Sequence, residues 1–208
     1  MKLSPNIDYI KWDANRHAEN AGSEFLPKDR QSHFWIDYVQ GFYKVMERIR
    51  AKYPDVLIQA CASCGGRVEY GALKYFDEVW MSDNTEALSR ARIQYGTSLF
   101  YPAVVMGSHV SATPNHQTGN ITPIKFRFDM ACAGRLGMEL QPRQMTDEER
   151  QFARRAIASY KEYRDIVMQG DLYRIGTPYD KSGCYGLMYV SKDRKQAVLF
   201  TYLSLIHI

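Results

Sequence analysis

The stretch DVLIQAC, residues 55–61, is a short, continuous apolar run with Pro54 before it and two glycines, Gly65 and Gly66, shortly after it. A run of this kind is typical of a strand that is buried on both faces of a parallel sheet. In the segment before it, apolar residues from Trp35 to Ile49 recur at helical spacing, and Pro54 is expected to end that helix. A helix that leads into a buried strand is one step of a βαβ unit.

The same alternation continues on both sides of this stretch. Strands are predicted at residues 7–13, 78–83, 99–106 and 136–140, and helices at residues 70–76, 87–95 and 126–133. Thr85 is placed to cap the second of these helices. Strands that alternate with helices favour a parallel α/β sheet. Because a complete (β/α)8 barrel needs roughly 250 residues, this pattern leaves two architectures open, an open doubly wound sheet and part of a barrel.

A change of period near residue 171 predicts a second module. Thr146 and Glu149 form a capping box, in which each side chain accepts a hydrogen bond from the other residue's backbone N–H. The helix that this box opens is expected to end at Gly170. Residues 172–175, 184–190 and 196–202 then alternate between apolar and polar residues, as antiparallel strands do.

The composition is that of a globular protein and argues against several classes of partner. The chain has 208 residues and a net charge of +4, with Lys and Arg spread along it, so nucleic-acid binding is not expected. No stretch approaches the length of about eighteen apolar residues that a membrane span needs, and the first residues show no leader pattern, so no membrane partner is expected. Aromatic residues at 13% fit a sugar-binding cleft and core packing equally well.

Cys61 and Cys64 form a C-x-x-C pair, the pattern of half a zinc site or of a redox dithiol. A structural zinc site needs four ligands, and no second C-x-x-C or closely spaced His pair supplies the rest. The pair also lies just before two glycines rather than at the start of a clear helix, which disfavours redox chemistry. We therefore expect no metal, and a redox or metal protein is the least favoured reading.

Polar residues stand at the ends of three predicted strands, where a purely structural sheet would not need them. Asp13 ends the first, Cys61 the second and Asp83 the third. Because the carboxyl ends of strands in α/β folds face the ligand crevice, two aspartates there suit a carboxylate pair that acts as nucleophile and acid/base. The alternative is that both aspartates cap the segments that follow. His109 and His116 are expected in a polar loop, residues 108–123, as hydrogen-bonding groups rather than ligands.

Five short motifs follow one another along the chain. They are YIKWDANR (9–16), CASCGGR (61–67), WMSDNT (80–85), IQYGTS (93–98) and SATPNHQ (111–117). The first three resemble the Y-x-K-W-D-x-N-R, C-x-x-G-G-G-R and W-T-S-D-x-T segments of family 36 glycoside hydrolases, the melibiase-type α-galactosidases. The other two also look like signatures of that family, and the order and spacing of all five, over about residues 7–202, argue against a chance match.

The resemblance implies an architecture. Residues 1–170 would be the C-terminal part, about strands 4–8, of a catalytic (β/α)8 TIM barrel, and residues 171–202 the start of an antiparallel β-sandwich domain. Family members carry an N-terminal β-sandwich and three more barrel strands before the point that matches Met1, so we expect a C-terminal fragment that is inactive by itself. Residues 203–208, LSLIHI, match one reading frame of a transposon-based sequencing adapter, and we expect them not to be native coding sequence.

The resemblance also implies a reaction, the retaining hydrolysis of terminal α-D-galactosyl linkages in oligosaccharides such as raffinose and melibiose. In that double displacement Asp13 would be the nucleophile and Asp83 the general acid/base. Lys11 lies two residues from Asp13 on the same face of the strand, so its positive charge favours the ionised carboxylate. No cofactor is implied, the compartment stays open, and a homo-oligomer of the full-length protein is compatible with the family.

Five residues would bind the sugar by the same resemblance: Lys11, Trp12, Asn15, Cys61 and Cys64. Two positions depart from the family pattern, because Cys64 stands where the pattern has Gly and Met81 where it has Thr. Cys64 brings a side chain to a place where backbone would approach the sugar, which favours a non-catalytic carbohydrate-binding relative as one alternative. The alternative within the same chemistry is galactosyl transfer, as in oligosaccharide synthases.

Overall fold

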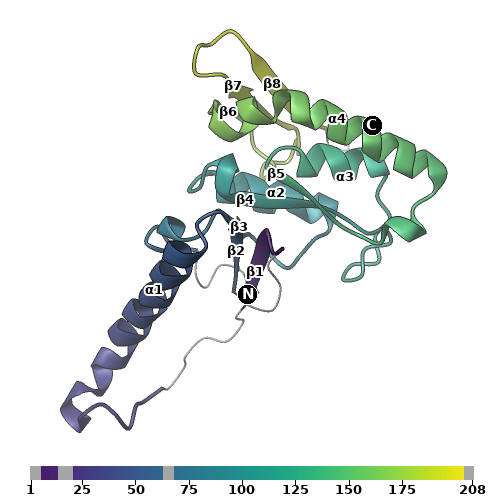
Figure 1. Ribbon diagram of the computed structural model, residues 1–208. Coiled ribbons are helices and arrows are strands. Elements are labelled where there is room, and N and C mark those ends of the chain that lie inside the picture. The colour runs from purple at the N-terminus through teal and green to yellow at the C-terminus, as the bar shows by residue number, and fades with distance from the viewer. Residues whose placement is uncertain (1–5, 14–20, 63–67, 204–208) are drawn as a thin grey trace. The chain divides into compact units, whose positions relative to one another are not determined.

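The computed structural model describes residues 6–13, 21–62 and 68–203 and divides into two compact units, residues 1–80 and 81–208. Each unit is described by itself. In Figure 1 the first runs from purple to blue and the second from teal through green to yellow.

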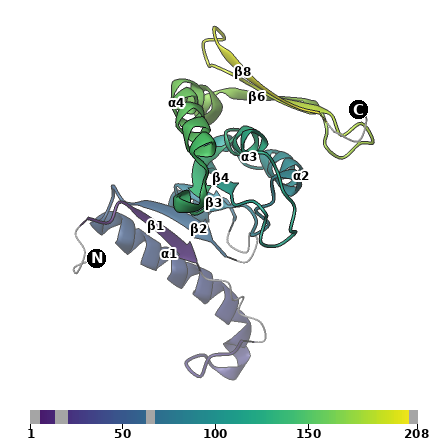
Figure 2. The same cartoon turned by 90° about the vertical axis from the view of Figure 1, so that its right-hand side faces the viewer.

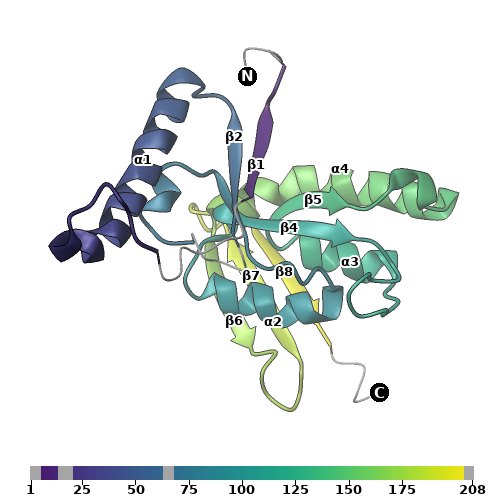
Figure 3. The ribbon, with the colours of Figure 1, turned by 90° about the horizontal axis from the view of Figure 1, so that it is seen from below.

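The first unit is built on three parallel strands, β1 (Tyr9–Asp13), β2 (Leu57–Cys61) and β3 (Glu78–Trp80). The long helix α1 (Phe34–Lys52) follows the 3₁₀ turn η1 (Lys28–His33), and a second 3₁₀ turn, η2 (Ala72–Lys74), precedes β3. Figure 3 shows β1 and β2 side by side and running in the same direction. Both connections between parallel strands are therefore crossovers, as a βαβ arrangement requires.

One face of these strands packs on α1 and η2. The buried cluster comprises Met46, Ile58, Ala60, Ala72, Tyr75, Phe76 and Val79, with Trp12 and Phe42 packed against it. Because successive side chains of a strand point to opposite faces, Trp12 on the helix-facing side places Lys11 and Asp13 on the other side. The apolar period of the sequence thus decides which side chains of β1 are left for chemistry.

The second unit begins with α2 (Ala87–Ser98), the 3₁₀ turn η3 (Ala103–Val105) and strand β4 (Met106–Ser111). It continues with α3 (Ile124–Ala131), strand β5 (Arg135–Glu139), the 3₁₀ turn η4 (Pro142–Gln144) and the long helix α4 (Asp147–Gln169). Strands β4 and β5 are parallel and pair from Gly107–Arg135 to Ser111–Glu139. Val110, Phe128, Ala153 and Tyr160 belong to one buried cluster, so α3 and α4 cover one face of this strand pair.

An antiparallel sheet completes the second unit, with strands β6 (Asp171–Gly176), β7 (Tyr185–Val190) and β8 (Ala197–Tyr202) in that order. Figure 2 shows it edge-on, with the helices on one side of it. Its tyrosines fix it to α3 and to the turn directly after α3. The Tyr202 hydroxyl donates to the Asp129 carbonyl (2.9 Å), and the Tyr189 hydroxyl donates to the Ala133 carbonyl (2.8 Å). Burial raises the pKa of both phenols, so they remain donors at any ordinary pH.

Three local predictions are wrong. The strand predicted at residues 99–106 lies later, at Met106–Ser111, so that His109 lies in a strand rather than in a loop. Gly107, His109 and Ser111 alternate with the residues that pack on the helices, and these small or polar side chains hide the strand from a search for apolar runs. The helix predicted at 70–76 is a single 3₁₀ turn, and Glu86 rather than Thr85 caps α2, through bonds from the Leu88 and Ser89 amides.

The capping box of α4 is present, with the Thr146 hydroxyl accepting from the Glu149 amide and the Glu149 carboxylate from the Thr146 amide, both at 3.2 Å. We expect Thr146→Ala to lower the free energy of unfolding by about 1 kcal/mol, because a helix N-terminus loses one of its few acceptors. Ser159→Ala, which removes an exposed hydroxyl in the middle of the same helix, is the control and should change stability by less than about 0.5 kcal/mol. Denaturant unfolding of both variants measures the difference, and equal stabilities would contradict a role for the cap.

Candidate active site

The carboxyl end of β1 presents a cation and a carboxylate on the same face. Asp13 is exposed and pairs in register with Cys61, the last residue of β2, which is 4% exposed. The Lys11 ammonium lies 4.8 Å from the centroid of the Trp80 ring, over the last residue of β3. A cation over an indole face is held in place while part of its shell stays open to a ligand. Lys11 therefore lies on the same face of β1 as Asp13, and its role in binding a sugar stays a prediction.

A partly buried hydrogen-bonded network lies closer to the amino ends of the same strands. Lys11, Gln59 and Glu78 are register partners across β1, β2 and β3. Both the Tyr9 hydroxyl (2.5 Å) and the Gln59 amide (2.6 Å) donate to Oε1 of Glu78, and Gln59 is fully buried. Such a network fixes the relative positions of three strands behind the exposed residues. Sequence reasoning did not single out Gln59 and Glu78.

Of the other predicted sugar-binding residues, the structure describes Trp12 but not Asn15 or Cys64. Trp12 packs against the cluster between the strands and α1, on the face opposite to Lys11, so the structure gives it a packing role. A contact between Trp12 and a sugar stays a prediction. Asn15 and Cys64 lie outside the described residues, and so do residues 204–208 of the expected adapter-derived segment.

Asp83 lies in a loop of the second unit that is fixed by its neighbours. Asp83 itself is exposed, whereas Thr85 and Glu86, two and three residues later, are buried. The Asn84 side chain accepts from the Glu86 amide (3.1 Å), and Thr85 Oγ1 accepts from the Asn115 side-chain amide (3.2 Å). The alternative in which Asp83 caps the following helix is wrong, because Glu86 is the cap.

The buried Arg90 of α2 reaches back to the same loop. Its Nε donates to the Asn84 carbonyl (2.7 Å) and its Nη2 to the Ser82 carbonyl (2.6 Å). Burial lowers the pKa of Arg90 to about 10, and the negative charges of Glu139 and Asp83 oppose that shift. Arg90 therefore remains a cation at neutral pH.

The carboxyl ends of β4 and β5 bring further polar groups together. His109 Nδ1 lies 3.8 Å from Oε2 of Glu139, the last residue of β5. The His109 ring lies against Gly137, where an added Cβ would come within 2.4 Å of the ring, so only glycine leaves room for it. Glu139 thus lies near His109, and its negative charge also raises the pKa of Arg90. Nothing in its sequence context singles it out.

Among the residues that the structure describes, neither a cluster of metal-ligating side chains nor a membrane-spanning helix is found. No group of three or more His, Cys, Asp and Glu side chains in ranges 6–13, 21–62 and 68–203 is arranged to hold a metal ion. Within the same ranges no helix combines the length and the apolar character needed to span a bilayer.

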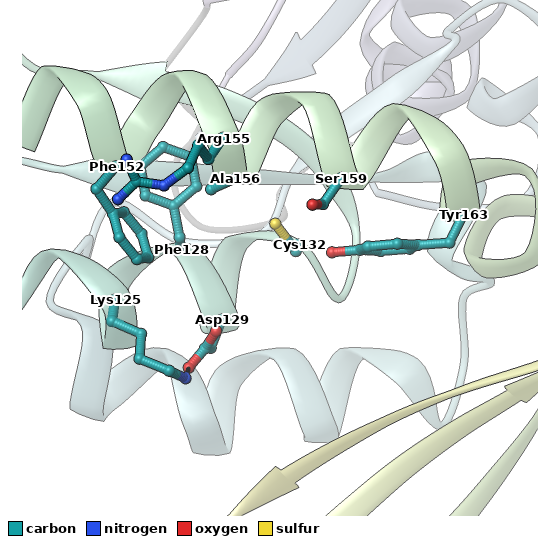
Figure 4. Close-up of a pocket in the computed structure, with 9 residues that line it drawn as sticks. All are labelled: Lys125, Phe128, Asp129, Cys132, Phe152, Arg155, Ala156, Ser159 and Tyr163. Atoms are coloured by element: carbon teal, nitrogen blue, oxygen red, sulfur yellow. Dashed lines mark hydrogen bonds and ion pairs between the residues drawn. The ribbon is translucent and has the colours of Figure 1, made fainter.

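A small pocket of about 270 Å³ lies between α3 and α4 (Figure 4). Phe128, Phe152 and Tyr163 contribute aromatic rings to it, and Lys125 and Asp129 pair across one turn of α3. Burial raises the pKa of Cys132 in this pocket to about 11, so its thiol stays protonated and unreactive. None of the candidate site residues lines this pocket.

Each unit thus carries an exposed aspartate at or shortly after the end of a strand in the sequence: Asp13 has a cation on its own strand, and Asp83 lies on a braced loop. Paired carboxyl groups are typical of the sugar-cleaving enzymes. The family model described as Melibiase matches residues 2–170, and the chain belongs to this family.

Relatives match nearly the whole chain. It is 42% identical over 196 residues to α-galactosidase AgaA of Geobacillus stearothermophilus, covering 94% of this chain and 27% of that protein. It is 43% identical over 194 residues to the bifunctional α-galactosidase/sucrose kinase AgaSK of Mediterraneibacter gnavus, covering 93% of this chain and 20% of that protein. The chain therefore spans about a quarter of the length of these relatives or less.

Solved structures agree. The crystal structure of AgaA in complex with raffinose superposes with a TM-score of 0.89 at 42% identity, over 93% of this chain and 27% of that one. The α-galactosidase of Lactobacillus brevis superposes with a TM-score of 0.92 at 42% identity, over 96% and 27%. The prediction of a C-terminal barrel segment followed by the start of an antiparallel β domain is confirmed, and the open doubly wound sheet is excluded.

Proposed function

We propose that this chain carries both catalytic carboxylates of a longer retaining α-galactosidase, which hydrolyses terminal α-D-galactosyl linkages of raffinose- or melibiose-type oligosaccharides. Membership of the Melibiase family and the names of the relatives support the class of reaction. Crystal structures of AgaA with raffinose and with stachyose support an α-galactoside oligosaccharide as substrate.

One observation carries the assignment of the two aspartates. The AgaA structure with raffinose has an Asp-to-Asn substitution and the one with stachyose an Asp-to-Ala substitution, at positions 70 residues apart. Asp13 and Asp83 are also 70 residues apart. Removing a catalytic carboxyl is a direct way to keep an oligosaccharide uncleaved in a crystal, so the matching separation supports Asp13 and Asp83 as the reacting pair.

The proposed reaction has two displacements. The ionised Asp13 attacks the anomeric carbon while the protonated Asp83 donates its proton to the departing glycosidic oxygen. Asp83, now ionised, then takes a proton from water, which displaces Asp13 and releases galactose with the α configuration retained. Lys11, held over Trp80, binds sugar hydroxyls beside Asp13.

The remaining contacts follow the resemblance. Asn15 would share the hydroxyl contacts of Lys11, and Cys61 and Cys64 would lie near the 2-hydroxyl. Cys61 at the end of β2, in register with Asp13, is consistent with that placement. Cys64 in place of Gly keeps a non-catalytic carbohydrate-binding relative as the second candidate.

The test is the full open reading frame, expressed and incubated with p-nitrophenyl α-galactoside and with raffinose. We expect nitrophenol release and, by NMR, α-galactose as the first-formed sugar. β-Galactose as the first product would contradict double displacement, and galactose binding without turnover would favour the non-catalytic relative. Galactosylated oligosaccharides as the main products would show transfer in place of hydrolysis.

A further inference from the structure

We propose that Arg90 is a positioning residue for Asp83, holding the acid/base loop so that its carboxyl can protonate the leaving oxygen. This inference rests on the proposed function and deepens it. Arg90 lies on α2, seven residues beyond Asp83, and does not itself reach the reacting atoms in this proposal.

The contacts of Arg90 bracket Asp83. Arg90 binds the carbonyl of Ser82, directly before the aspartate, and the carbonyl of Asn84, directly after it. With both peptide groups anchored to one guanidinium, the backbone dihedral angles of Asp83 have little freedom. A general acid depends on such restraint, because a displacement of about 1 Å in a catalytic group can cost about 10²-fold in rate.

The burial and the shape of the Arg90 guanidinium suit it to hold the backbone of the Asp83 loop. Arg90 is 3% exposed, and an arginine is rarely buried to this extent unless it is paired; its Nε and Nη2 both donate to backbone carbonyls. A fork of two N–H donors can span two carbonyls at fixed angles, whereas a lysine ammonium can bind the same oxygens with far less geometric restraint. The position therefore demands arginine for its shape as well as its charge.

Charge around the loop is balanced as the acid/base role requires. A lone cation next to Asp83 would hold the carboxyl ionised and weaken it as an acid. The negative charge of Glu139, at the end of β5, also raises the pKa of Arg90, as that of Asp83 does. Arg90 can thus brace the loop without acting as the sole counter-ion of Asp83.

The chain supplies a matched control in Arg50 of α1. Its Nε donates to the Tyr75 carbonyl and its Nη1 to the Val56 carbonyl, both at 2.7 Å, and it pairs with Asp77. Val56 and Asp77 directly precede β2 and β3, so Arg50 braces backbone at the amino ends of strands, far along them from the candidate chemistry. Losing it tests for a purely structural cost.

The experiment compares two substrates in the full-length protein. Melibiose has a poor leaving group and needs protonation by the acid, whereas p-nitrophenyl α-galactoside needs little help. We expect Arg90→Met to lower kcat/KM for melibiose by about 10²-fold, the lower end of general-acid effects, and for the nitrophenyl substrate by less than about 5-fold. Arg90→Lys should recover part of the loss. Arg50→Met should affect both substrates equally.

Equal losses on both substrates in Arg90→Met would overturn the positioning role. If that variant does not fold, Arg90→Lys decides, since it too must lose more activity on melibiose than on the nitrophenyl substrate. Wild-type protein without activity on either substrate would instead refute the proposed function. An active wild type with Asp83→Ala selective for the better leaving group, but Arg90 variants unselective, would refute the inference about Arg90 alone.

Discussion

Asp13→Ala should abolish α-galactosidase turnover in the full-length protein, lowering kcat on the order of 10⁴-fold or more, as loss of a nucleophile does in other hydrolases. The reason is that the proposed covalent glycosyl intermediate forms on the Asp13 carboxylate. Azide should restore part of the rate with p-nitrophenyl α-galactoside by occupying the space of the lost carboxylate. Because a single displacement inverts the anomeric centre, the product should be β-galactosyl azide.

Asp8→Ala is the control for this prediction. Asp8 is an exposed aspartate directly before β1, at the opposite end of the strand from Asp13. Its variant should keep turnover within about 2-fold of wild type, as surface substitutions away from a site usually change little. An Asp13→Ala protein with wild-type turnover, or one whose azide product has the α configuration, would remove Asp13 from the nucleophile's role.

The strands could be predicted where apolar residues dominate, and not where small or polar residues occupy one face of the strand. The stretch 55–61 reads as a buried strand and lies in β2, because five of its seven residues are apolar. The strand predicted at residues 99–106 was placed several residues too early, because Gly107 and His109 of β4 occupy the face away from the helices. A strand with small or polar residues on one face lacks the apolar run on which such a prediction depends.

The candidate site shows the same division. Asp13, Lys11 and Asp83 could be found because they stand in contiguous motifs at strand ends. Arg90 could not, because an arginine within a helix reads as a solvated residue, and only the fold shows that it is buried against the Asp83 loop. Glu139 could not be found from the sequence either, because the groups it interacts with, His109 of β4 and Arg90 of α2, lie far from it in sequence.

Asp83→Ala should give a result that differs in kind from that of Asp13→Ala. Loss of the general acid should lower kcat/KM for melibiose by about 10² to 10⁴-fold, whereas the first displacement on p-nitrophenyl α-galactoside should be little affected because nitrophenolate leaves without a proton. The glycosyl intermediate then accumulates, since no base activates water, and a burst of nitrophenol should precede slow turnover.

Azide separates the two aspartates. In Asp83→Ala it should react with the intermediate in place of water and raise steady-state turnover, and two successive inversions give α-galactosyl azide. Asp180→Ala, at an exposed turn of the antiparallel domain, is the matched control and should behave as wild type towards both substrates. If Asp83→Ala loses activity equally on both substrates and yields no azide adduct, Asp83 supports the fold rather than the proton transfer. If it yields β-galactosyl azide, the roles of Asp13 and Asp83 are exchanged.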